Sequence, residues 1–573
     1  MHPLKTASGL GLLALAGLAA CGGGSDATSV TDSATLPQLT AATAGTLNAC
    51  AALLTGFSNA NTTLTAATDV AAGALTVGGV AVPAHCQVTG KMYSRTGTNG
   101  SYAIGFEMRL PLAWNGRFFY QGNGGLDGSV ATAVGATGGG PLTHALLQGF
   151  AVISSDAGHS GAQTALFGFD PQARLDYGYQ AAQKLTPMAK SLIAAAYGRG
   201  PDRSYFGGCS NGGRHTLVAT ARLAQEYDGF LAGAPGYNLP KAAIAQIWGA
   251  QQWAQAYTAG STVTASTGAV VPDLSTAFTA AERSLVGRRI LAKCDGLDLV
   301  ADGIVSDTAA CQKAFKVADD VPTCSGTRDG SCLTAQQKDI LTAVFAGAKT
   351  TSGAAIYNSF PYDPGIAGSN WATWKFVNSQ ALDPLAVGTV FGTPPAYMAT
   401  PLTADIDAQV ARISATDTTY TESGLSFMTP PNPAELSTLK KRGAKVMVYH
   451  GVSDPVFSFD DSVTWYRNLA AANGGDARNF ARLYGVPGMN HCSGGPATDQ
   501  FDMLSALVKW VEQGQTPESV IATARGTGNA GGVNTELPSD WAANRSRPLC
   551  AYPQVAKYKG SGSIEDAANF SCQ

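Results

Sequence analysis

The sequence is short of charged residues. Asp, Glu, Lys and Arg make up 13% of its 573 residues and the formal net charge is −3, whereas about 25% charged is usual. Nucleic-acid binding needs clustered Lys and Arg to neutralise phosphates, so no nucleic-acid partner is expected. No C-x-x-C pair occurs, which excludes the ligand pattern of zinc ribbons and the redox motif of thioredoxin-like proteins.

The apolar run at the start of the chain is also short. Residues 9–20 follow Lys5 and have the pattern of a secretory signal, with too few residues to span a bilayer. The run ends at Cys21 like a bacterial lipobox, so we expect residues 1–20 to be a signal peptide, Cys21 to carry the only membrane anchor, and residues 21–40 to be a flexible tether. An ordinary signal with a chance cysteine is the alternative. Either reading predicts export, to the periplasm, the outer membrane or the medium.

Beyond Cys21, ten cysteines remain. An even number suits an oxidising compartment and up to five disulfides. The sequence itself leaves their connectivity open.

Strand and helix patterns alternate in two parts of the chain. The alternation predicts a parallel sheet with helices on both faces, and no element is evident in residues 36–80. The expected strands are residues 106–110, 117–120, 151–154, 203–207, 230–234, 445–449 and 481–484, and the expected helices are residues 181–197, a helix from about residue 213, and residues 502–512.

The middle of the chain breaks this pattern. Residues 236–439 are rich in Trp, Thr, Gly and Pro and hold four of the ten cysteines. We interpret them as a lid inserted between two parts of one core, residues 41–235 and 440–573. An unrelated second domain is the alternative.

Gly208, Cys209, Ser210, Asn211 and Gly212 match G-x-S-x-G between an expected strand and an expected helix. A tight strand-to-helix turn of this kind presents a nucleophilic serine in α/β-hydrolases, and the glycines avoid steric collisions there. A plain glycine turn is the alternative. The context predicts an α/β-hydrolase core with Ser210 as nucleophile.

A serine nucleophile needs a histidine base and an acid, which follow it in the order Ser, acid, His in this fold. His491 lies in a Gly/Pro loop after an expected strand, whereas His215 lies on the helix beside the serine and His450 ends an apolar strand. We therefore expect His491 to be the base. Asp454 follows the strand at 445–449 and is the expected acid, with an Asx-turn cap as the alternative.

Cys209 precedes the expected nucleophile and Cys492 follows the expected base. If Ser210 and His491 are within hydrogen-bonding reach, these neighbours can form a disulfide.

The Cys-Ser, Asp and His-Cys arrangement resembles the tannase and feruloyl esterase family over nearly the whole mature chain. The resemblance implies a serine ester hydrolase acting on small aromatic esters, with the backbone N–H groups of Gly125 and Asn211 as oxyanion hole. The segments that carry the likeness are WNGRFF at 114–119, DPQARLD at 170–176, AGAPGY at 232–237 and PGMNHCSGG at 487–495.

The same resemblance implies five disulfides and a structural calcium ion. Clustered aspartates favour a hard cation, but a solvated Asp-Gly turn is an equal reading of the residues alone. The implied calcium ligands are Asp295, Asp298 and Asp302 with backbone oxygens of Val300 and Ile304. The implied disulfides are Cys50–Cys86, Cys209–Cys492, Cys294–Cys311, Cys324–Cys332 and Cys550–Cys572.

The substrate side of the lid is less defined. Residues 358–410 contain no Arg, and Lys375 is their only cation. Trp371 and Trp374 are expected to stack on an aromatic acyl group, with packing inside the lid as the alternative. We expect a monomeric ester hydrolase; the competing functions are an acyltransferase or peptidase with the same triad, and a catalytically silent surface lipoprotein that binds aromatic ligands.

Overall fold

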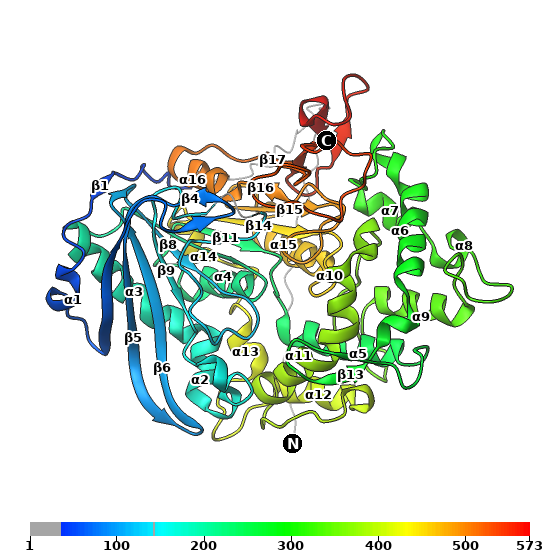
Figure 1. Cartoon of the computed structure of the whole chain (residues 1–573), viewed down its shortest axis with the longest axis horizontal. Helices are drawn as coiled ribbons and strands as arrows, with labels where there is room; N and C mark the ends of the chain where they lie inside the picture. Colours follow the sequence, from blue (N-terminus) through cyan, green and yellow to red (C-terminus); the bar gives the residue numbers. More distant parts are fainter. Residues whose placement is uncertain (1–35, 141–143) are drawn as a thin grey trace, which may run out of the picture. The chain divides into compact units, whose positions relative to one another are not determined.

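The centre of the protein is a nine-stranded mixed sheet, seen in a computed structural model that describes residues 36–140 and 144–573 (Figure 1). The expected signal peptide, Cys21 and most of the tether lie outside these residues. The strand order is β15-β14-β11-β10-β8-β9-β6-β5-β2. Strands β15 (Ala481–Val486), β14 (Lys445–Gly451), β11 (Gly229–Gly233), β10 (Arg203–Cys209), β8 (Arg117–Gln121) and β9 (Ala151–Ser155) run parallel.

Hydrophobic cores cover both faces of the parallel strands. On β8, Phe118 and Tyr120 belong to one core and Phe119 to the other, which is the alternation of a strand buried on both sides. Helices α3 (Ala181–Tyr197), α4 (Asn211–Arg222) and α15 (Phe459–Ala472) contribute to the first core, and α16 (Met503–Gln513) contributes to the second. The expected parallel sheet with helices on both faces is therefore present.

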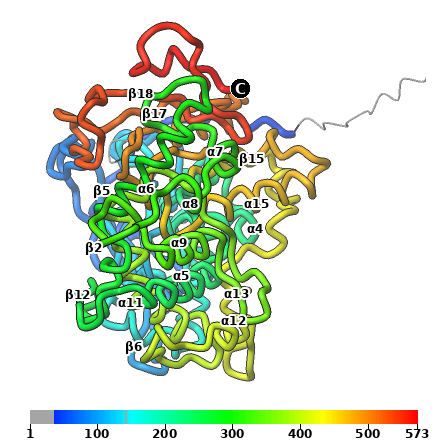
Figure 2. Tube along the Cα trace, turned by 90° about the vertical axis from the view of Figure 1, so that its right-hand side faces the viewer, coloured from blue at the N-terminus to red at the C-terminus, as the bar shows by residue number. Residues whose placement is uncertain are grey.

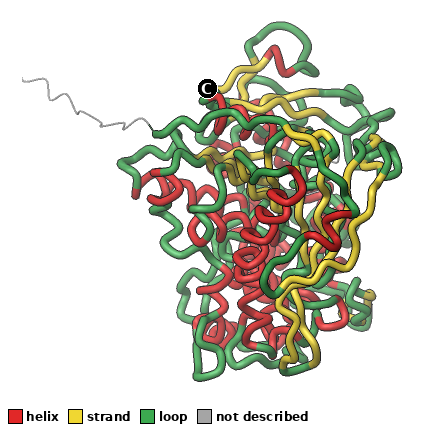
Figure 3. The backbone as a smooth tube through the Cα atoms, turned by 90° about the vertical axis from the view of Figure 1, so that its left-hand side faces the viewer, coloured by secondary structure: helices red, strands yellow, loops and turns green. Residues whose placement is uncertain are grey.

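Three further strands extend the sheet in antiparallel fashion. They are β2 (Thr62–Val70), β5 (His85–Gly97) and β6 (Gly100–Pro111). Figure 3 shows the long strands of this extension in yellow along one edge of the view. The sequence patterns identified only part of β6 and neither of the other two.

Residues 236–439 leave the sheet after β11, and the chain rejoins it at β14. Within the described residues, this segment adds no strand to the nine-stranded sheet; we call it the insertion, and its chain fills much of Figure 2 in green. Its two strands, β12 (Thr262–Thr264) and β13 (Val270–Pro272), pair with each other. Its helices are α5 (Leu239–Trp253), α6 (Ala280–Cys294), α7 (Thr308–Ala314), α8 (Val317–Asp320), α9 (Ala335–Ala346), α10 (Ser369–Ala372), α11 (Ser379–Leu385), α12 (Ile406–Ser414), α13 (Gly424–Met428) and α14 (Ser437–Lys441).

The C-terminal part adds a small antiparallel sheet and a hairpin. These are β16 (Gln500–Phe501), β17 (Ser519–Thr523) and β18 (Ser546–Cys550), followed by β19 (Ala556–Tyr558) and β20 (Phe570–Cys572). No helix within the described ranges is long and apolar enough to cross a bilayer.

Five disulfides tie the chain together, with the pairing that the family resemblance implies. Such a set is typical of proteins that fold in an oxidising compartment, which supports export. The pairs are Cys50–Cys86, Cys209–Cys492, Cys294–Cys311, Cys324–Cys332 and Cys550–Cys572.

Candidate active site

Ser210 occupies a strained turn between β10 and α4. Its backbone has φ 66° and ψ −126°, a conformation that costs free energy for a residue with a Cβ. Gly208 and Gly212 flank it, and a Cβ on either would collide with the carbonyl oxygen of Gly122. The close approach of the neighbouring loop therefore explains why the turn has the sequence G-x-S-x-G.

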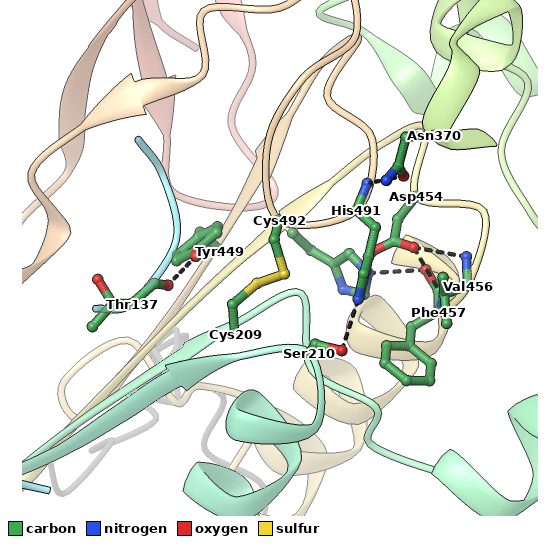
Figure 4. Close-up of a disulfide and its surroundings, with 11 residues drawn as sticks. Thr137, Cys209, Ser210, Asn370, Tyr449, Asp454, Val456, Phe457, His491 and Cys492 are labelled. Atoms are coloured by element: carbon green, nitrogen blue, oxygen red, sulfur yellow. Dashed lines mark hydrogen bonds and ion pairs between the residues drawn. A yellow bond between two sulfur atoms is a disulfide. The ribbon is translucent and has the colours of Figure 1, made fainter. Parts of the chain in front are cut away.

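Ser210, His491 and Asp454 are joined by two hydrogen bonds, drawn in Figure 4. His491 Nε2 lies 2.8 Å from Ser210 Oγ, and His491 Nδ1 lies 2.7 Å from Asp454 Oδ2. In this arrangement, the histidine can accept the serine proton while the carboxylate holds the ring orientation. The three residues selected from the sequence are thus brought together by three separate segments of the fold.

Asp454 is buried and held as a carboxylate. Its Oδ1 accepts hydrogen bonds from the backbone N–H groups of Val456 at 2.8 Å and Phe457 at 3.1 Å. Burial acts to raise the pKa of Asp454, but the charge interaction with His491 and hydrogen bonds from His450 and His491 hold it well below the usual range. These interactions therefore favour the ionised form of the acid.

His450, the rejected base, is a buried structural residue whose Nε2 also lies 3.4 Å from Asp454 Oδ2. It is fully buried, with Nδ1 2.8 Å from Ser462 Oγ and Nε2 2.9 Å from the Phe457 carbonyl. His215, the other rejected base, lies 2.9 Å from Asp127 Oδ2. Neither imidazole bonds to Ser210.

Cys209 and Cys492 form the expected disulfide beside the triad (Figure 4). Their Cα atoms are 6.1 Å apart although 283 positions separate them in sequence. The bond fixes the backbone next to Ser210 against the backbone next to His491.

The expected oxyanion donors are also next to the serine. Asn211 is the first residue of α4, so its backbone N–H has no partner inside the helix, and its side-chain Nδ2 bonds to the Asn123 carbonyl at 3.2 Å. Gly125 lies in the loop after β8, residues 122–125, which we call the glycine loop, and has φ 63°. The Tyr177 hydroxyl lies 3.2 Å from both the Gly125 carbonyl oxygen and Asn211 Oδ1. Two side chains thus couple the glycine loop to the nucleophile turn.

The sequence of this chain is similar to those of known proteins. A model of the tannase and feruloyl esterase family matches residues 86–573. The chain is 39% identical over 570 residues to mono(2-hydroxyethyl) terephthalate hydrolase of Piscinibacter sakaiensis, and the match covers 91% of each protein. The chain belongs to the tannase and feruloyl esterase family. It is accordingly a serine carboxylic ester hydrolase.

Fungal proteins match this chain at lower identity. A probable feruloyl esterase B-1 of Neosartorya fischeri is 28% identical over 512 residues, covering 81% of this chain and 82% of that protein. The crystal structure of feruloyl esterase B from Aspergillus oryzae aligns with a TM-score of 0.71 at 24% identity, covering 91% of this chain and 99% of the other. Tannin acyl hydrolase from Aspergillus niger gives 0.66 at 19%, covering 90% and 92%. These structures confirm the expected α/β-hydrolase fold.

Two aromatic rings flank the catalytic imidazole of this family member. Trp374, from the insertion, and Phe457, from the loop after Asp454, each lie with the ring centroid 5.4 Å from that of His491, edge to face. Trp371 is only 3% exposed and packs against other buried aromatic rings. Of the two tryptophans selected from the sequence, only Trp374 is therefore placed to meet a ligand; Trp371 has the packing role left open above.

Lys375, the only cation of residues 358–410, is turned into the protein. The residue is 4% exposed and its Nζ lies 3.6 Å from the ring centroid of Phe360. Burial lowers the pKa of this lysine to about 7, against the charges of Asp454 and Asp383. A buried amine in contact with a ring is poorly presented to a bound substrate.

The aspartates of the expected calcium loop lie together at the end of α6. Asp295 accepts from the backbone N–H groups of Asp302 and Gly303, Asp298 accepts from that of Ser306 at 3.3 Å, and Asp302 pairs with Arg547. Burial, with the nearby Asp302 carboxylate, raises the pKa of Asp298 to about 7. No group of three or more His, Cys, Asp or Glu side chains in the described part of the chain is arranged to hold a metal, so calcium stays a prediction.

Two contacts of His491 had no sequence signal. The Asn370 side-chain oxygen accepts from the His491 backbone N–H at 3.3 Å (Figure 4), and Phe457 packs on the imidazole. Asn370 is 121 positions from His491, and an Asn or Phe in a loop carries no pattern that would reveal such a contact. Only the fold identifies them.

Proposed function

We propose that this enzyme hydrolyses aromatic carboxylic esters through a covalent acyl-enzyme on Ser210. The observation that carries the proposal is the continuous chain of hydrogen bonds from Ser210 Oγ through His491 to Asp454, at 2.8 and 2.7 Å. His491 accepts the hydroxyl proton as Ser210 attacks the ester carbonyl, and the Asp454 carboxylate stabilises the imidazolium. The backbone N–H groups of Asn211 and Gly125 stabilise the oxyanion.

The second half of the cycle reuses the same groups. His491 returns the proton to the leaving alcohol oxygen as the tetrahedral intermediate collapses to the acyl-enzyme. A water molecule then attacks the acyl carbon, His491 accepts its proton, and the acid is released as Ser210 recovers its hydrogen. An acyltransferase would use an alcohol in place of this water, and a silent aromatic-binding lipoprotein would need no triad; neither alternative has support in the family comparison.

We propose that the preferred substrates carry an aromatic acyl group without a free carboxylate. Trp374 and Phe457 supply ring faces or edges beside the reacting centre, which suits an aromatic acyl group. The terephthalate half-ester in the name of the Piscinibacter relative carries a free carboxylate, which an arginine fork recognises well. Residues 358–410 contain no arginine and their one lysine is buried, so neutral hydroxycinnamate or benzoate esters are expected to bind at least as well.

A structural calcium ion and a lipid anchor complete the proposal. Three aspartates and the backbone oxygens of Val300 and Ile304 would supply an all-oxygen donor set, the kind that calcium prefers. The buried Asp298 carboxylate accepts hydrogen bonds from the backbone N–H groups of Val300 at 3.4 Å and Ser306 at 3.3 Å. The calcium would hold the loop after α6 in place and take no part in the chemistry. The lipobox-like run at residues 18–21 supports lipidation of Cys21. We also propose that the enzyme is a monomer.

Ser210→Ala tests the central assignment. The variant should keep the wild-type melting temperature and lose about 10⁴ to 10⁶ in rate on a chromogenic aromatic ester, as loss of a triad function typically does. A fluorophosphonate should add one phosphonyl group to Ser210 of the wild type, detected by peptide mass spectrometry. Retention of most activity by the alanine variant would overturn the proposal.

A further inference from the structure

Asp363, in the insertion, bonds to two separate loops of the catalytic core. It is 1% exposed and precedes the short helical turn Pro364–Ala367. Its Oδ1 accepts hydrogen bonds from the Ser453 hydroxyl and from the Gly365 backbone N–H at 3.0 Å. Its Oδ2 accepts from the Gly488 backbone N–H at 3.2 Å. One carboxylate therefore holds three donors from three segments.

The two core loops are those of the triad. Ser453 directly precedes Asp454, and Gly488 lies three positions before His491. The loops also contact each other directly, because the Ser453 backbone N–H donates to the Met489 carbonyl at 3.1 Å. We propose that Asp363 is a positioning residue that sets the spacing between the acid loop and the base loop, and so the geometry of the Asp454–His491 pair.

The backbone beside Asp363 presses on the same two loops. A Cβ on Gly365 would come within 2.5 Å of both the Gly488 carbonyl oxygen and the Ser453 side chain, far closer than real Cβ contacts. The Gly365 carbonyl also accepts from Asn490 Nδ2 at 3.0 Å. The insertion thus fits against the acid and base loops without spare room, and the Asp363 carboxyl group lies at the centre of this contact.

A carboxylate is the side chain that suits this position. All three partners of Asp363 are donors, and an ionised carboxylate accepts on both oxygens. Replacement by Asn keeps one accepting oxygen but puts an NH₂ group opposite either the Gly488 N–H or the donors on the other side. A buried donor that faces another donor leaves both polar groups unpaired, which is unfavourable and pushes the two loops apart.

The inference rests on the proposed roles of Asp454 and His491, so its test is made separable from theirs. In Asp363→Asn, a displaced imidazole should lower the rate constant of phosphonylation by a fluorophosphonate about 10-fold or more, and kcat by a similar factor, with KM within about twofold. Misplacement of a catalytic group by about 1 Å can cost about 100-fold. Rate constants are expressed per Ser210 that reacts with the fluorophosphonate, so that a loss of folded protein does not lower them.

Asp273→Asn is the matched control. Asp273 also caps a short helical turn of the insertion. Its side chain accepts from the Ser275 backbone N–H at 3.1 Å and from the Ser275 hydroxyl at 2.6 Å, and both of these bonds are local. This variant should keep both rate constants within about twofold of the wild type. Ser453→Ala, which removes one arm of the contact, should lower kcat by itself and add little in the Asp363→Asn background, because contacting residues are not additive.

The outcomes are distinct. Full activity of Ser210→Ala would remove the proposed triad. An inactive Ser210→Ala with an unchanged kcat per site in Asp363→Asn would overturn the positioning role alone. Equal losses in Asp363→Asn and Asp273→Asn would show that the insertion acts only through its stability. If Asp363→Asn does not fold, Ser453→Ala decides, since unchanged phosphonylation there overturns the inference as well.

Discussion

Cys209 and Cys492 are bonded to each other, and each is the sequence neighbour of a residue of the triad. The bond therefore links the strained serine turn covalently to the loop that carries the base. No other disulfide of the described chain links two triad neighbours.

The Cys209→Ala/Cys492→Ala variant should lose more activity than stability. Removing a disulfide costs about 2–5 kcal/mol of stability in small domains. Here the base loop also loses its fixed distance to Ser210, so kcat should fall even when it is measured far below the melting temperature. Cys550→Ala/Cys572→Ala is the control, because that bond joins β18 to β20 without a triad neighbour. Equal effects of the two variants on kcat, or free Cys209 and Cys492 thiols in the exported protein, would contradict the prediction.

Lys375→Met should change how stability depends on pH. Burial lowers the pKa of Lys375 to about 7 in the folded protein, against about 10.4 in the unfolded chain. Between these values, the folded state binds fewer protons, so the free energy of unfolding rises with pH. The variant should be more stable at pH 6 and show a smaller rise toward pH 9 in urea unfolding. Lys349→Met, at an exposed site, should keep the wild-type slope; the same slope in both variants would contradict the assignment.

Chelation should lower the melting temperature without stopping catalysis. A bound ion stabilises the folded state in proportion to the logarithm of its excess over the dissociation constant, and no proposed step needs a metal. The measurement is thermal unfolding with EDTA and with added calcium, alongside kcat at a temperature where both samples are folded. Asp298→Asn should abolish the calcium response. A melting temperature indifferent to EDTA and to calcium would favour an ordinary Asp-Gly turn.

The charge of the substrate should matter little. We expect kcat/KM for an uncharged benzoate ester to equal or exceed that for the terephthalate half-ester, because residues 358–410 offer a free carboxylate no arginine and only a buried lysine. Both esters are assayed with the same alcohol group to isolate the acyl part. A preference of about a hundredfold for the half-ester, worth nearly 3 kcal/mol, would mean that a cation from another segment reaches the carboxylate.

The sequence predicts the catalytic half of this fold better than the rest. Helix α3 was expected at its observed bounds, because its Ala-rich pattern has a clear apolar face, and β10 with Ser210 stands out because strand, glycines and helix follow one another within 20 residues. Strand β2 was missed: its Thr and Ala side chains lie largely in solvent at the sheet edge, so alternation carries little hydrophobic signal.

The helices of the insertion were not predicted from the sequence, for the opposite reason. Helix α5 is buried on almost all sides, and a helix that is apolar all round has no period to detect. Asp363 looks like an ordinary turn cap in the sequence, and its partners Ser453 and Gly488 lie 90 and 125 positions away. Long-range contacts of this kind follow from how the segments pack, which local sequence does not encode.

The order of the triad along the chain sets when the enzyme can first act. Ser210 is synthesised first, the whole insertion follows, and His491 comes 281 positions after Ser210. A nascent polypeptide that already displays its serine turn therefore lacks the acid, the base and the cysteine that fixes the base loop. Hydrolysis is possible only once the chain has been synthesised past His491, and the disulfide between Cys209 and Cys492 forms only where thiols are oxidised. The complete site with its disulfide therefore assembles only after the chain has been synthesised past Cys492 and its thiols have met an oxidising environment.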